Sequence, residues 1–539
     1  MVSLSPSVNY TETDISVRVA SLASSIGAIV GHSQRGPLTK TLIHDTESFI
    51  ATYGPPTPGD YLHYCSLGFL RRSNQLWVRR AINAASPPLY GGVVIKAAPG
   101  AANVPLAVGV ANPNTVGDGQ PGSYVWGLNE IMLILAPNPG AWNNNCTVKI
   151  TNISASDFEF DIEFYEKDAG GTPRLVHRRR VSRKGRLTGK KDGYGRNMYV
   201  GDVFGVGDTN YFIVVDNTAE DTLMPLPQAA YLSLAGGTDD SGALANDDVK
   251  LAWGDFENPE DVTVNILING GYAFEADADI GKEMDRIAQA RQDCVAVLDT
   301  PFDLSSSALV TWRTTTLGLN SSYSALYAPW LKVYDPYNDK DVWIPPSGHI
   351  AGVYALTDYV TEPWFAPAGK NRGMIVAKEL SKNFPKGERD TLYPAGINPI
   401  RKLQAGGNAV WGQRNLQTKE SRTNRINVRR LLITVQGSLT TALEDFQFEQ
   451  NDYATRLQIE MAATAFLRDI QRRRGLYDFA VVCDERNNTP DVIDSQEIRA
   501  DFYLKPTAVG EFMRARSVVT PTGVSFEEAI GLVQSLPAV

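Results

Sequence analysis

The chain has 539 residues, a formal net charge of −9 and a hydrophobic fraction of 43%. This length exceeds what one hydrophobic core usually holds, so we expect three or more domains. The acidic balance argues against a protein whose main task is to coat nucleic acid. The absence of an apolar run of about 18 residues argues against membrane insertion.

The start of the chain, MVSLSPSVNYTETD, has no basic segment and no long apolar core, so we expect no secretory signal. The cysteines lie far apart and form no CxxC pair; they are Cys65, Cys146, Cys294 and Cys483. This pattern predicts buried, reduced thiols in a protein made in the cytoplasm rather than a disulfide framework.

The first elements after a polar, extended stretch are two apolar strands. These strands are IGAIVG (Ile26–Gly31) and QLWVRRA (Gln75–Ala81). Between them, DTESFIATYG is typical of a helix that begins at Asp45 or Thr46 and stops at Gly54.

A long middle segment has a different composition. Residues 85–127 are rich in Gly, Pro, Ala and Asn, which is typical of long loops. From Tyr124 to about Gly236, short alternating stretches such as FEFDIEFYEK and YFIVVD recur. This is an all-β pattern, so we expect an inserted β-rich domain here.

Periodicity changes again after Thr238. An apolar strand (Val262–Asn269), a helix (Asp279–Asp293) and a second apolar strand (Cys294–Pro301) follow one another. The helix places three apolar residues on one face, namely Ile280, Met284 and Ile287. Strand–helix–strand with apolar strands predicts a parallel βαβ unit. A further helix is expected around residues 309–318.

The last third of the chain predicts helices and a hairpin. SLTTALEDF and residues 452–474 read as helices, and Tyr477–Asp484 and Glu497–Pro506 as two strands. The tail from Ser517 onward is polar and extended, like the first twenty residues.

The search for catalytic motifs finds little. There are five histidines, none with HExxH or paired-ligand spacing, and there is no GxSxG elbow or phosphate-binding GxxxxGK[ST] loop. The acidic stretch Thr238–Asp248 lacks calcium-loop spacing. His349, in PPSGHIAG, could be catalytic, but a hydrogen-bonded structural histidine is the favoured interpretation. We therefore expect no catalytic residue, cofactor or metal.

The strongest charge signal is HRRRVSRKGRLTGKK (His177–Lys191), with eight Arg or Lys residues. One interpretation is nucleic-acid or anionic-surface binding. The favoured one is an exposed hairpin that pairs with a neighbour's carboxylates, because no aromatic side chain interleaves the run to stack on bases.

The predicted helix Asp452–Arg474 has two faces. Phe466 and Ile470 share one face, with Ile459 nearby, and Arg468 and Arg472 lie opposite. Three arginines, Arg472, Arg473 and Arg474, end the helix. They could compensate the helix dipole, worth about 0.3–1 kcal/mol each, or form a docking face for an acidic partner. The residues alone leave both readings open.

Several ordered segments together resemble contractile phage tail sheath proteins. The most specific is NSSYSALYAPWLKVYDPYNDKDVWIPPSGHIAGVYALTD (Asn320–Asp358), which is crowded with aromatic side chains. The likeness continues in FAPAGKNRG, GINPIRKL, RTNRINVRRLL, FEQND, GLYDFAVVCDERNN and, near the N-terminus, IGAIVGHSQRGPLTKTLI. It is weak from about residue 90 to 235.

The resemblance implies a multidomain α/β and α+β protein with a subtilisin-like α/β core. The expected parts are an N-terminal arm (1–20), the first part of the core (21–90), an inserted β-rich outer domain (91–235), the main sheath domain (236–395), an α+β tube-facing domain (396–516) and a C-terminal arm (517–539). The aromatic segment would then pack core and inter-subunit contacts rather than bind a substrate.

The resemblance also implies sites and partners. The arms would add strands to a neighbour's hairpin through Val8, Tyr10, Ile15, Val17, Val518, Val519, Val524 and Phe526. The accepting hairpin would present Phe479, Val481, Cys483, Ile498 and Phe502. Docking to the tube would use Arg468, Arg472, Arg473 and Arg474, with Arg425, Arg429 and Arg430 next in line.

The implied function is a contractile sheath on a phage tail, part of the virion and assembled in the host cytoplasm. Expected partners are copies of itself in a sixfold helical or ring assembly, a tail tube protein, and baseplate and tail terminator proteins, with no nucleic acid or membrane. The alternatives are the sheath of a phage-derived bacteriocin or secretion particle, a subtilisin-like hydrolase, and a nucleic-acid-binding protein.

Overall fold

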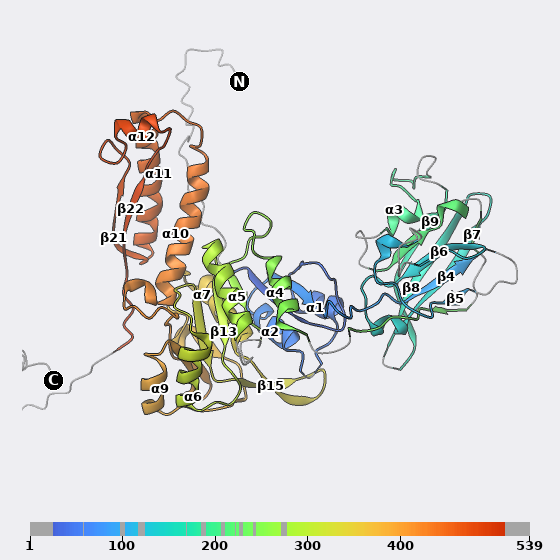
Figure 1. Cartoon of the computed structure of the whole chain (residues 1–539), viewed down its shortest axis with the longest axis horizontal. Coiled ribbons are helices and arrows are strands. Elements are labelled where there is room, and N and C mark those ends of the chain that lie inside the picture. The colour runs from blue at the N-terminus through green and yellow to red at the C-terminus, as the bar shows by residue number, and fades with distance from the viewer. Residues whose placement is uncertain are drawn as a thin grey trace, which may run out of the picture.

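The computed structural model describes residues 25–57, 59–97, 103–116, 124–168, 170–184, 190–205, 211–220, 223–225, 230–240, 244–270 and 278–512. Three parts follow one another across the molecule (Figure 1): an upright helical module, an α/β core, and a β-rich domain on the opposite side. Both expected arms, with every arm residue named above, lie outside the described residues.

The core is built on a sheet that, within the described residues, has nine strands in the order β17-β20-β19-β14-β13-β12-β1-β3-β2. The central strands from β19 to β3 pair in parallel, and β2, β17 and β20 pair antiparallel. The bounds are β1 (Gly27–His32), β2 (Thr41–Ile43), β3 (Leu76–Ala81), β12 (Ile266–Ile268), β13 (Val295–Asp299), β14 (Ser324–Ala328), β17 (Met374–Ile375), β19 (Ile397–Lys402) and β20 (Asn408–Val410).

The expected βαβ unit is confirmed, because β12 and β13 pair in parallel across helix α5 (Asp279–Arg291). The two early strands are confirmed as β1 and β3. A domain boundary was expected at residue 396, but the core sheet continues past it, because β19 and β20 follow this position and still belong to the sheet.

Both faces of the core sheet are covered by helices, which explains its continuous apolar strands. Along β1, Ala28 and Val30 join one buried cluster and Ile29 joins the other. The first face carries α4 (Asn246–Gly254), α5, α6 (Ser306–Thr311), a helical turn at Trp312–Leu317, and α9 (Lys386–Leu392). The second carries α1 (Thr46–Tyr53), α2 (Tyr61–Leu70), α7 (Ser347–Val360), α8 (Gly369–Arg372) and a small sheet of β15 (Leu331–Asp335), β16 (Lys340–Ile344) and β18 (Glu379–Leu380).

Helix α1 begins and ends where the sequence predicts. The Asp45 side chain accepts a hydrogen bond from the Ser48 backbone N–H at 2.7 Å, which caps the first turn. Gly54 ends the helix with a φ of 84°, a conformation that glycine adopts without strain.

Helices α2 and α7 cross at glycines. A Cβ on Gly348 would overlap the Cys65 backbone, and one on Gly68 would lie 2.6 Å from the His349 ring. A Cβ on Gly352 would meet the Gly68 carbonyl oxygen at 3.0 Å. Small residues therefore let these two helices approach closely beneath the sheet.

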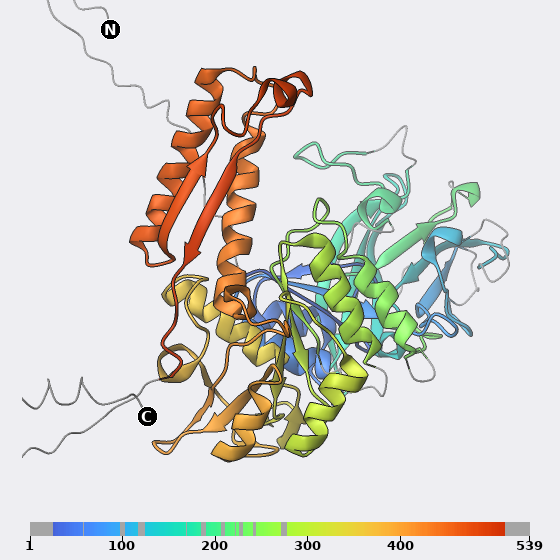
Figure 2. The ribbon, with the colours of Figure 1, turned by 60° about the vertical axis from the view of Figure 1, so that its left-hand side comes forward.

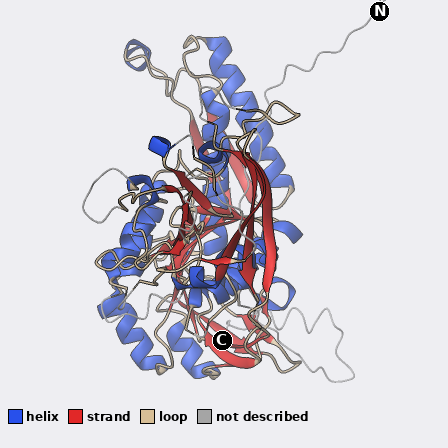
Figure 3. Cartoon of the chain, turned by 90° about the vertical axis from the view of Figure 1, so that its right-hand side faces the viewer, coloured by secondary structure: helices blue, strands red, loops and turns tan. Residues whose placement is uncertain are grey.

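The inserted domain contains two sheets of four described strands each, ordered β10-β6-β4-β5 and β11-β7-β8-β9. The bounds are β4 (Gly92–Lys96), β5 (Val104–Pro105), β6 (Glu130–Leu135), β7 (Cys146–Ser154), β8 (Glu159–Lys167), β9 (Pro173–Ser182), β10 (Ile213–Asp216) and β11 (Leu232–Ser233), with a short helix α3 (Val200–Val203). Figure 3, with this domain toward the viewer, shows its long curved strands. Their inner side chains form a separate core that includes Val148, Phe160 and Phe212.

The β-rich character of this segment is confirmed, but the loop prediction for residues 85–127 is wrong in part. Strand β4 lies within it, with Val93 and Ile95 fully buried. Composition averaged over the Gly- and Pro-rich segment hid this short apolar run.

The C-terminal module stands upright on the core (Figure 2). Helices α10 (Ile426–Glu444) and α11 (Tyr453–Arg472) pack together, and an antiparallel pair, β21 (Leu476–Val482) and β22 (Asp501–Pro506), lies against them. A short helix, α12 (Pro490–Asp494), lies in the connection from β21 to β22. SLTTALEDF is the end of the longer α10, and the second strand begins at Asp501 rather than Glu497.

Three cationic side chains join the inserted domain to the core. His32 lies between Asp60 and Asp240, 3.2 Å from each carboxylate. Arg35 pairs with Glu166 at 2.6 Å and lies over the Trp142 ring. The buried Arg80 donates to the carbonyl oxygens of Gly36 and Pro139.

The hydrogen bond to Asp240, followed by the one to Asp60, raises the pKa of His32 to about 9 from an ordinary 6.5. The ring is therefore positively charged at neutral pH, and the carboxylates hold it in place. Directional bonds from His32, Arg35 and Arg80 thus set how the inserted domain attaches.

Gly348→Ala should lower the free energy of unfolding by about 1–3 kcal/mol, because the added methyl overpacks the α2–α7 crossing. Urea denaturation measures this. Gly387→Ala is the control, since a Cβ there meets nothing within 4 Å and should be neutral or slightly stabilising. Equal stability of the two variants would show that the crossing is not close-packed.

His32→Gln should remove a pH-dependent part of the stability. Because the folded pKa lies above the unfolded one, this stabilisation is complete below about pH 6.5 and is lost as the pH rises to about 9. We expect about 1–2 kcal/mol, since 31% of the His32 side chain is exposed. Unfolding of wild type and variant across this range measures it. Exposed His44→Gln is the control. If the difference in unfolding free energy between wild type and H32Q were the same at every pH, a charged His32 held by the two carboxylates would be contradicted.

Candidate functional site

The place where an open α/β sheet usually holds a catalytic site is the carboxyl edge of its parallel strands. Here Ser347, at the start of α7, donates its backbone N–H to Asp299 at 2.8 Å, and its hydroxyl accepts from the Gly270 N–H at 3.1 Å. Cys65 lies 3.9 Å from the same hydroxyl, and burial raises the pKa of its thiol. These groups satisfy one another within the fold and present no free nucleophile.

His349 lies two residues after Ser347, in the first turn of α7, with its ring against Gly68. Burial, with the nearby charges of Arg71 and Arg72, lowers its pKa to about 4, so the ring is neutral at physiological pH. Its burial favours a structural rather than a catalytic role, but the expected hydrogen bond is not found, because the buried His349 Nδ1 has no partner among the described residues. Among the described residues, no group of three or more His, Cys, Asp or Glu side chains could hold a metal ion. No helix of the described part is long and apolar enough to cross a membrane.

The aromatic segment belongs mainly to the core. The hydroxyls of Tyr327 and Tyr354 lie 2.8 Å apart and are buried. The indole of Trp330 donates to the Thr300 carbonyl oxygen at 2.7 Å. Tyr334 is 47% exposed, on the β15–β16 hairpin. The segment therefore packs the core, as expected, and leaves part of its hairpin at the surface.

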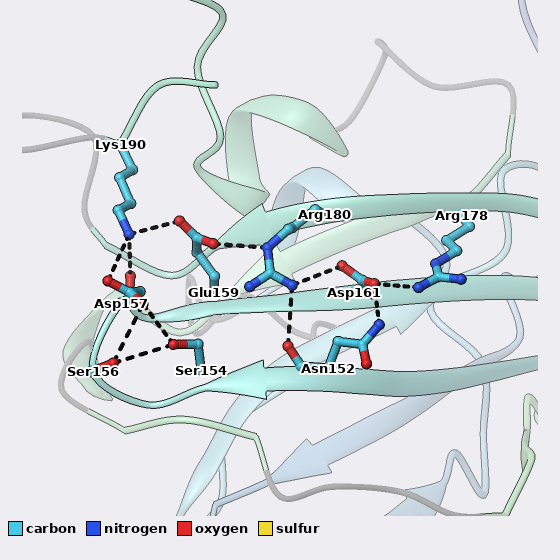
Figure 4. A network of polar contacts seen from close by, with 9 residues as sticks. All are labelled: Asn152, Ser154, Ser156, Asp157, Glu159, Asp161, Arg178, Arg180 and Lys190. Carbon is cyan, nitrogen blue, oxygen red and sulfur yellow. Dashed lines mark hydrogen bonds and ion pairs between the residues drawn. The ribbon is translucent and has the colours of Figure 1, made fainter. Parts of the chain in front are cut away.

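Three side chains of the basic run pair with carboxylates of their own domain (Figure 4). Arg178 pairs with Asp161 at 2.7 Å, and Arg180 pairs with Glu159 at 2.8 Å. Lys190 also pairs with Glu159, at 2.7 Å. The expected carboxylate partners exist, but they lie on the neighbouring strand β8 and its turn rather than on another subunit. This pairing weakens the nucleic-acid interpretation.

One arginine of the run is internal. Arg183 is fully buried and pairs with Asp216 at 2.6 Å, where it joins the two sheets of the inserted domain. It therefore serves the fold, and the basic run is not one continuous surface patch.

Helix α11 separates its two faces as the sequence predicts. Ile459, Phe466 and Ile470 are buried against α10 and the hairpin. Arg468 and Arg472 are exposed on the opposite face. The docking surface expected on this helix is thus open to solvent at these two positions.

The other two expected docking arginines have partners inside the molecule. Arg473 pairs with Glu362 at 2.8 Å and with Asp469 at 2.7 Å, and lies over the Trp364 ring. Arg474 is exposed and lies over the Phe365 ring. Arg473 therefore fastens the module to the core.

The three arginines expected as the alternative docking set also contact residues within the molecule. Arg425 pairs with Glu511 at 2.6 Å, and Arg430 forms a buried pair with Asp358 at 2.5 Å. Arg429 donates to the Ser322 hydroxyl at 2.5 Å. These contacts join residues far apart in the sequence, so helical spacing could not reveal them.

An apolar stripe on α11 was missed in the sequence. Tyr453 is 71% exposed and Met461 is 63% exposed, with Leu457 between them. Their spacing of four residues places them on the same face as Arg468 and Arg472. This i, i+4, i+8 spacing is the signal in the sequence that could have revealed the stripe. The exposed face of α11 is therefore apolar in its first half and basic in its second.

The hairpin residues divide into two groups. Phe479, Val481 and Phe502 pack partly buried against the α10–α11 pair. Cys483 and Ile498 lie beyond the strands, in a small cluster with Ile459, so their expected strand positions are wrong. Within the described residues, β21 and β22 pair only with each other, which leaves one edge of each strand open.

Two family models match adjacent segments of the chain. The phage tail sheath protein central domain matches residues 242–416, and the phage tail sheath C-terminal domain matches residues 418–520. Together they include the later strands of the core sheet and the C-terminal module.

Curated relatives are tail sheath proteins of bacteriophages. The chain is 32% identical over 363 residues to the tail sheath protein of Enterobacteria phage T4, and 33% identical over 367 residues to that of Vibrio phage KVP40. Each match covers 64% of this chain and 54% of the relative, so the chain spans about half the length of the curated relatives it matches.

Solved structures share the fold at low identity. The sheath tail protein of Listeria innocua has a TM-score of 0.56 at 13% identity, covering 91% of this chain and 96% of that one. The sheath of the extracellular contractile injection system PVC, in its contracted state, has a TM-score of 0.53 at 14% identity, covering 96% and 98%. With the matches above, these likenesses confirm the resemblance read from the sequence: the chain belongs to the contractile phage tail sheath protein family.

Proposed function

We propose that this chain is a structural protein that polymerises with copies of itself into a contractile sheath around a phage tail tube. The observation that carries the proposal is the pair of adjacent sheath-domain matches, one of which covers the module with the open-edged hairpin. An open strand edge is stabilised when another chain adds a strand to it.

The proposed mechanism uses stored conformational energy and no nucleotide. The extended sheath is metastable and held by the tube and baseplate. On triggering, subunits rotate outward layer by layer into a lattice with larger contacts, and the exchanged arms keep neighbours connected. The tube is driven through the host envelope, which places the protein in the tail of a virion assembled in the host cytoplasm.

The finer assignments belong to the same proposal. The core is taken as subtilisin-like, the assembly as sixfold, and the further partners as the tail tube, baseplate and tail terminator proteins. A phage-derived bacteriocin or secretion particle is the related alternative. The phage tail is favoured because the relatives at 32–33% identity are phage tail sheath proteins. The filled carboxyl edge of the core sheet disfavours a hydrolase.

The first test concerns assembly through the arms. Full-length protein should form tubes, rings or fibres in electron micrographs, and truncations that lack residues 1–20 or 517–539 should remain soluble and fail to polymerise. Their thermal unfolding should be unchanged, because the described residues already supply three buried apolar clusters. Each strand that is lost removes several hydrogen bonds worth about 0.5–1.5 kcal/mol each.

The control removes only residues 530–539, the end of the C-terminal arm that contains none of its named strand residues, and should still polymerise. Long tubes formed by either arm truncation would contradict strand exchange by that arm. Monodisperse full-length protein at every concentration would contradict the proposed assembly.

The second test concerns docking to the tube. Arg468→Glu combined with Arg472→Glu should impair extended sheath on tubes while sparing tube-free polymers. Exposed charge pairs are worth only about 0.2–1 kcal/mol each, but they repeat in every subunit. Tail assembly counted by electron microscopy measures this. Arg174→Glu with Lys184→Glu, two exposed positions of the inserted domain, makes the same charge change as a control. Normal tails from the α11 variant would place the docking face elsewhere.

A further inference from the structure

After β22, the chain returns to the core through residues 507–512, and Glu511 binds there. Its carboxylate accepts hydrogen bonds from the Tyr393 hydroxyl at 3.0 Å, the Gln413 side-chain amide at 2.8 Å and the Arg425 guanidinium at 2.6 Å. The Glu511 side chain is 15% exposed. A carboxylate with three donors, one of them charged, is a strong local attachment.

The three donors come from three separate elements. Tyr393 directly follows α9, Gln413 follows β20, and Arg425 is the N-cap residue of α10. One Glu511 oxygen takes the Tyr393 bond, and the other takes the bonds from Gln413 and Arg425. Glu511 therefore joins this segment to the core at the base of α10.

The opposite end of the segment is tied to the C-terminal module. The Thr507 N–H donates to the Gly475 carbonyl oxygen, and the Thr507 hydroxyl donates to the Arg474 carbonyl oxygen. Between the two ties, Val509 is 40% exposed and faces a groove of about 610 Å³, and Phe512, just beyond Glu511, is 78% exposed. The Glu511 bonds thus hold a segment that is otherwise open to solvent.

We propose that Glu511 is a latch that fixes the place where the C-terminal arm leaves its own subunit. With the latch closed, five residues lie between Phe512 and Val518, the first expected strand residue, and the six steps of the chain allow a reach of about 20 Å. With the latch open, the free segment begins after Thr507 and is eleven residues long, with a reach of about 35–40 Å.

The length of the free segment affects strand exchange between subunits, and this part of the inference rests on the proposed function. A longer free segment lowers the effective concentration of the arm at a neighbour's hairpin. The released residues must also be ordered again whenever the arm docks, which costs conformational entropy. A closed latch therefore prepares the arm for assembly without contributing a contact to the neighbour.

The test uses the full chain with Glu511→Gln, which keeps the side-chain shape but replaces one of the two accepting oxygens by an amide N–H₂ and removes the negative charge that pairs with Arg425. Glu497→Gln is the matched control, because Glu497 lies in the same module and pairs with the exposed Arg499. Hydrogen exchange of the Ala508 and Glu511 amides, measured in dilute protein, should be at least about tenfold faster in E511Q and unchanged in E497Q, while the Thr507 amide, bonded to Gly475, should stay protected in both. The protein concentration at which polymers sediment should rise by about tenfold in E511Q only.

Each outcome decides the proposal. Unchanged exchange in E511Q would show that Glu511 is no latch, and faster exchange with an unchanged polymerisation threshold would show that the latch does not serve assembly. If wild type and E497Q also fail to polymerise, the proposed function has failed, and exchange alone decides whether the latch exists. Should E511Q unfold, Tyr393→Phe removes one donor and keeps the carboxylate, and a smaller increase, about two- to fivefold, supports the latch.

Discussion

Arg430 and Asp358 form the buried ion pair on which the shape of the molecule depends. Arg430 lies near the base of α10 and Asp358 near the end of α7, so the pair fastens the upright module to the core. Arg430 also lies over the Tyr354 ring, whose hydroxyl contacts Tyr327 in the central strand β14. A buried pair adds little net stability over an apolar contact, but the loss of one partner costs about 3–5 kcal/mol. Here the pair fixes the orientation of the C-terminal module relative to the core.

Charged side chains also lie at the junction between the inserted domain and the core. The main apolar cluster of the inserted domain is separate from those of the core, whereas Arg35 and Arg80 connect the two through directional bonds, and His32 binds Asp240 in the segment that returns from the inserted domain. Apolar contacts permit sliding, but a cation held by a carboxylate or carbonyl oxygen has few favourable arrangements. Domains joined in this way can turn together as connected rigid bodies, as the proposed contraction would require.

Local features could be predicted from the sequence, and long-range pairs could not. The Asp45 cap, the βαβ unit and the two faces of α11 depend on residues a few positions apart. Arg473 looked like one of several similar helix-end arginines, but its partner Glu362 lies 111 positions away. The basic run was expected to pair with a neighbour's carboxylates, because periodicity does not show that β8 supplies acidic partners across the strand pair.

Two sheet edges of the molecule differ in a way that bears on assembly. Strand β9, the outer strand of its sheet, carries Arg174, Arg178, Arg179 and Arg180, and charges on an edge discourage pairing with another chain. Strand β21 has mostly apolar residues, LYDFAVV, with one charged side chain. A two-stranded sheet is marginal alone, and this one is supported on one face by α10 and α11. The hairpin is therefore supported within its own subunit, and among the described residues the outer edge of each of its strands has no strand partner, as the proposed strand exchange requires.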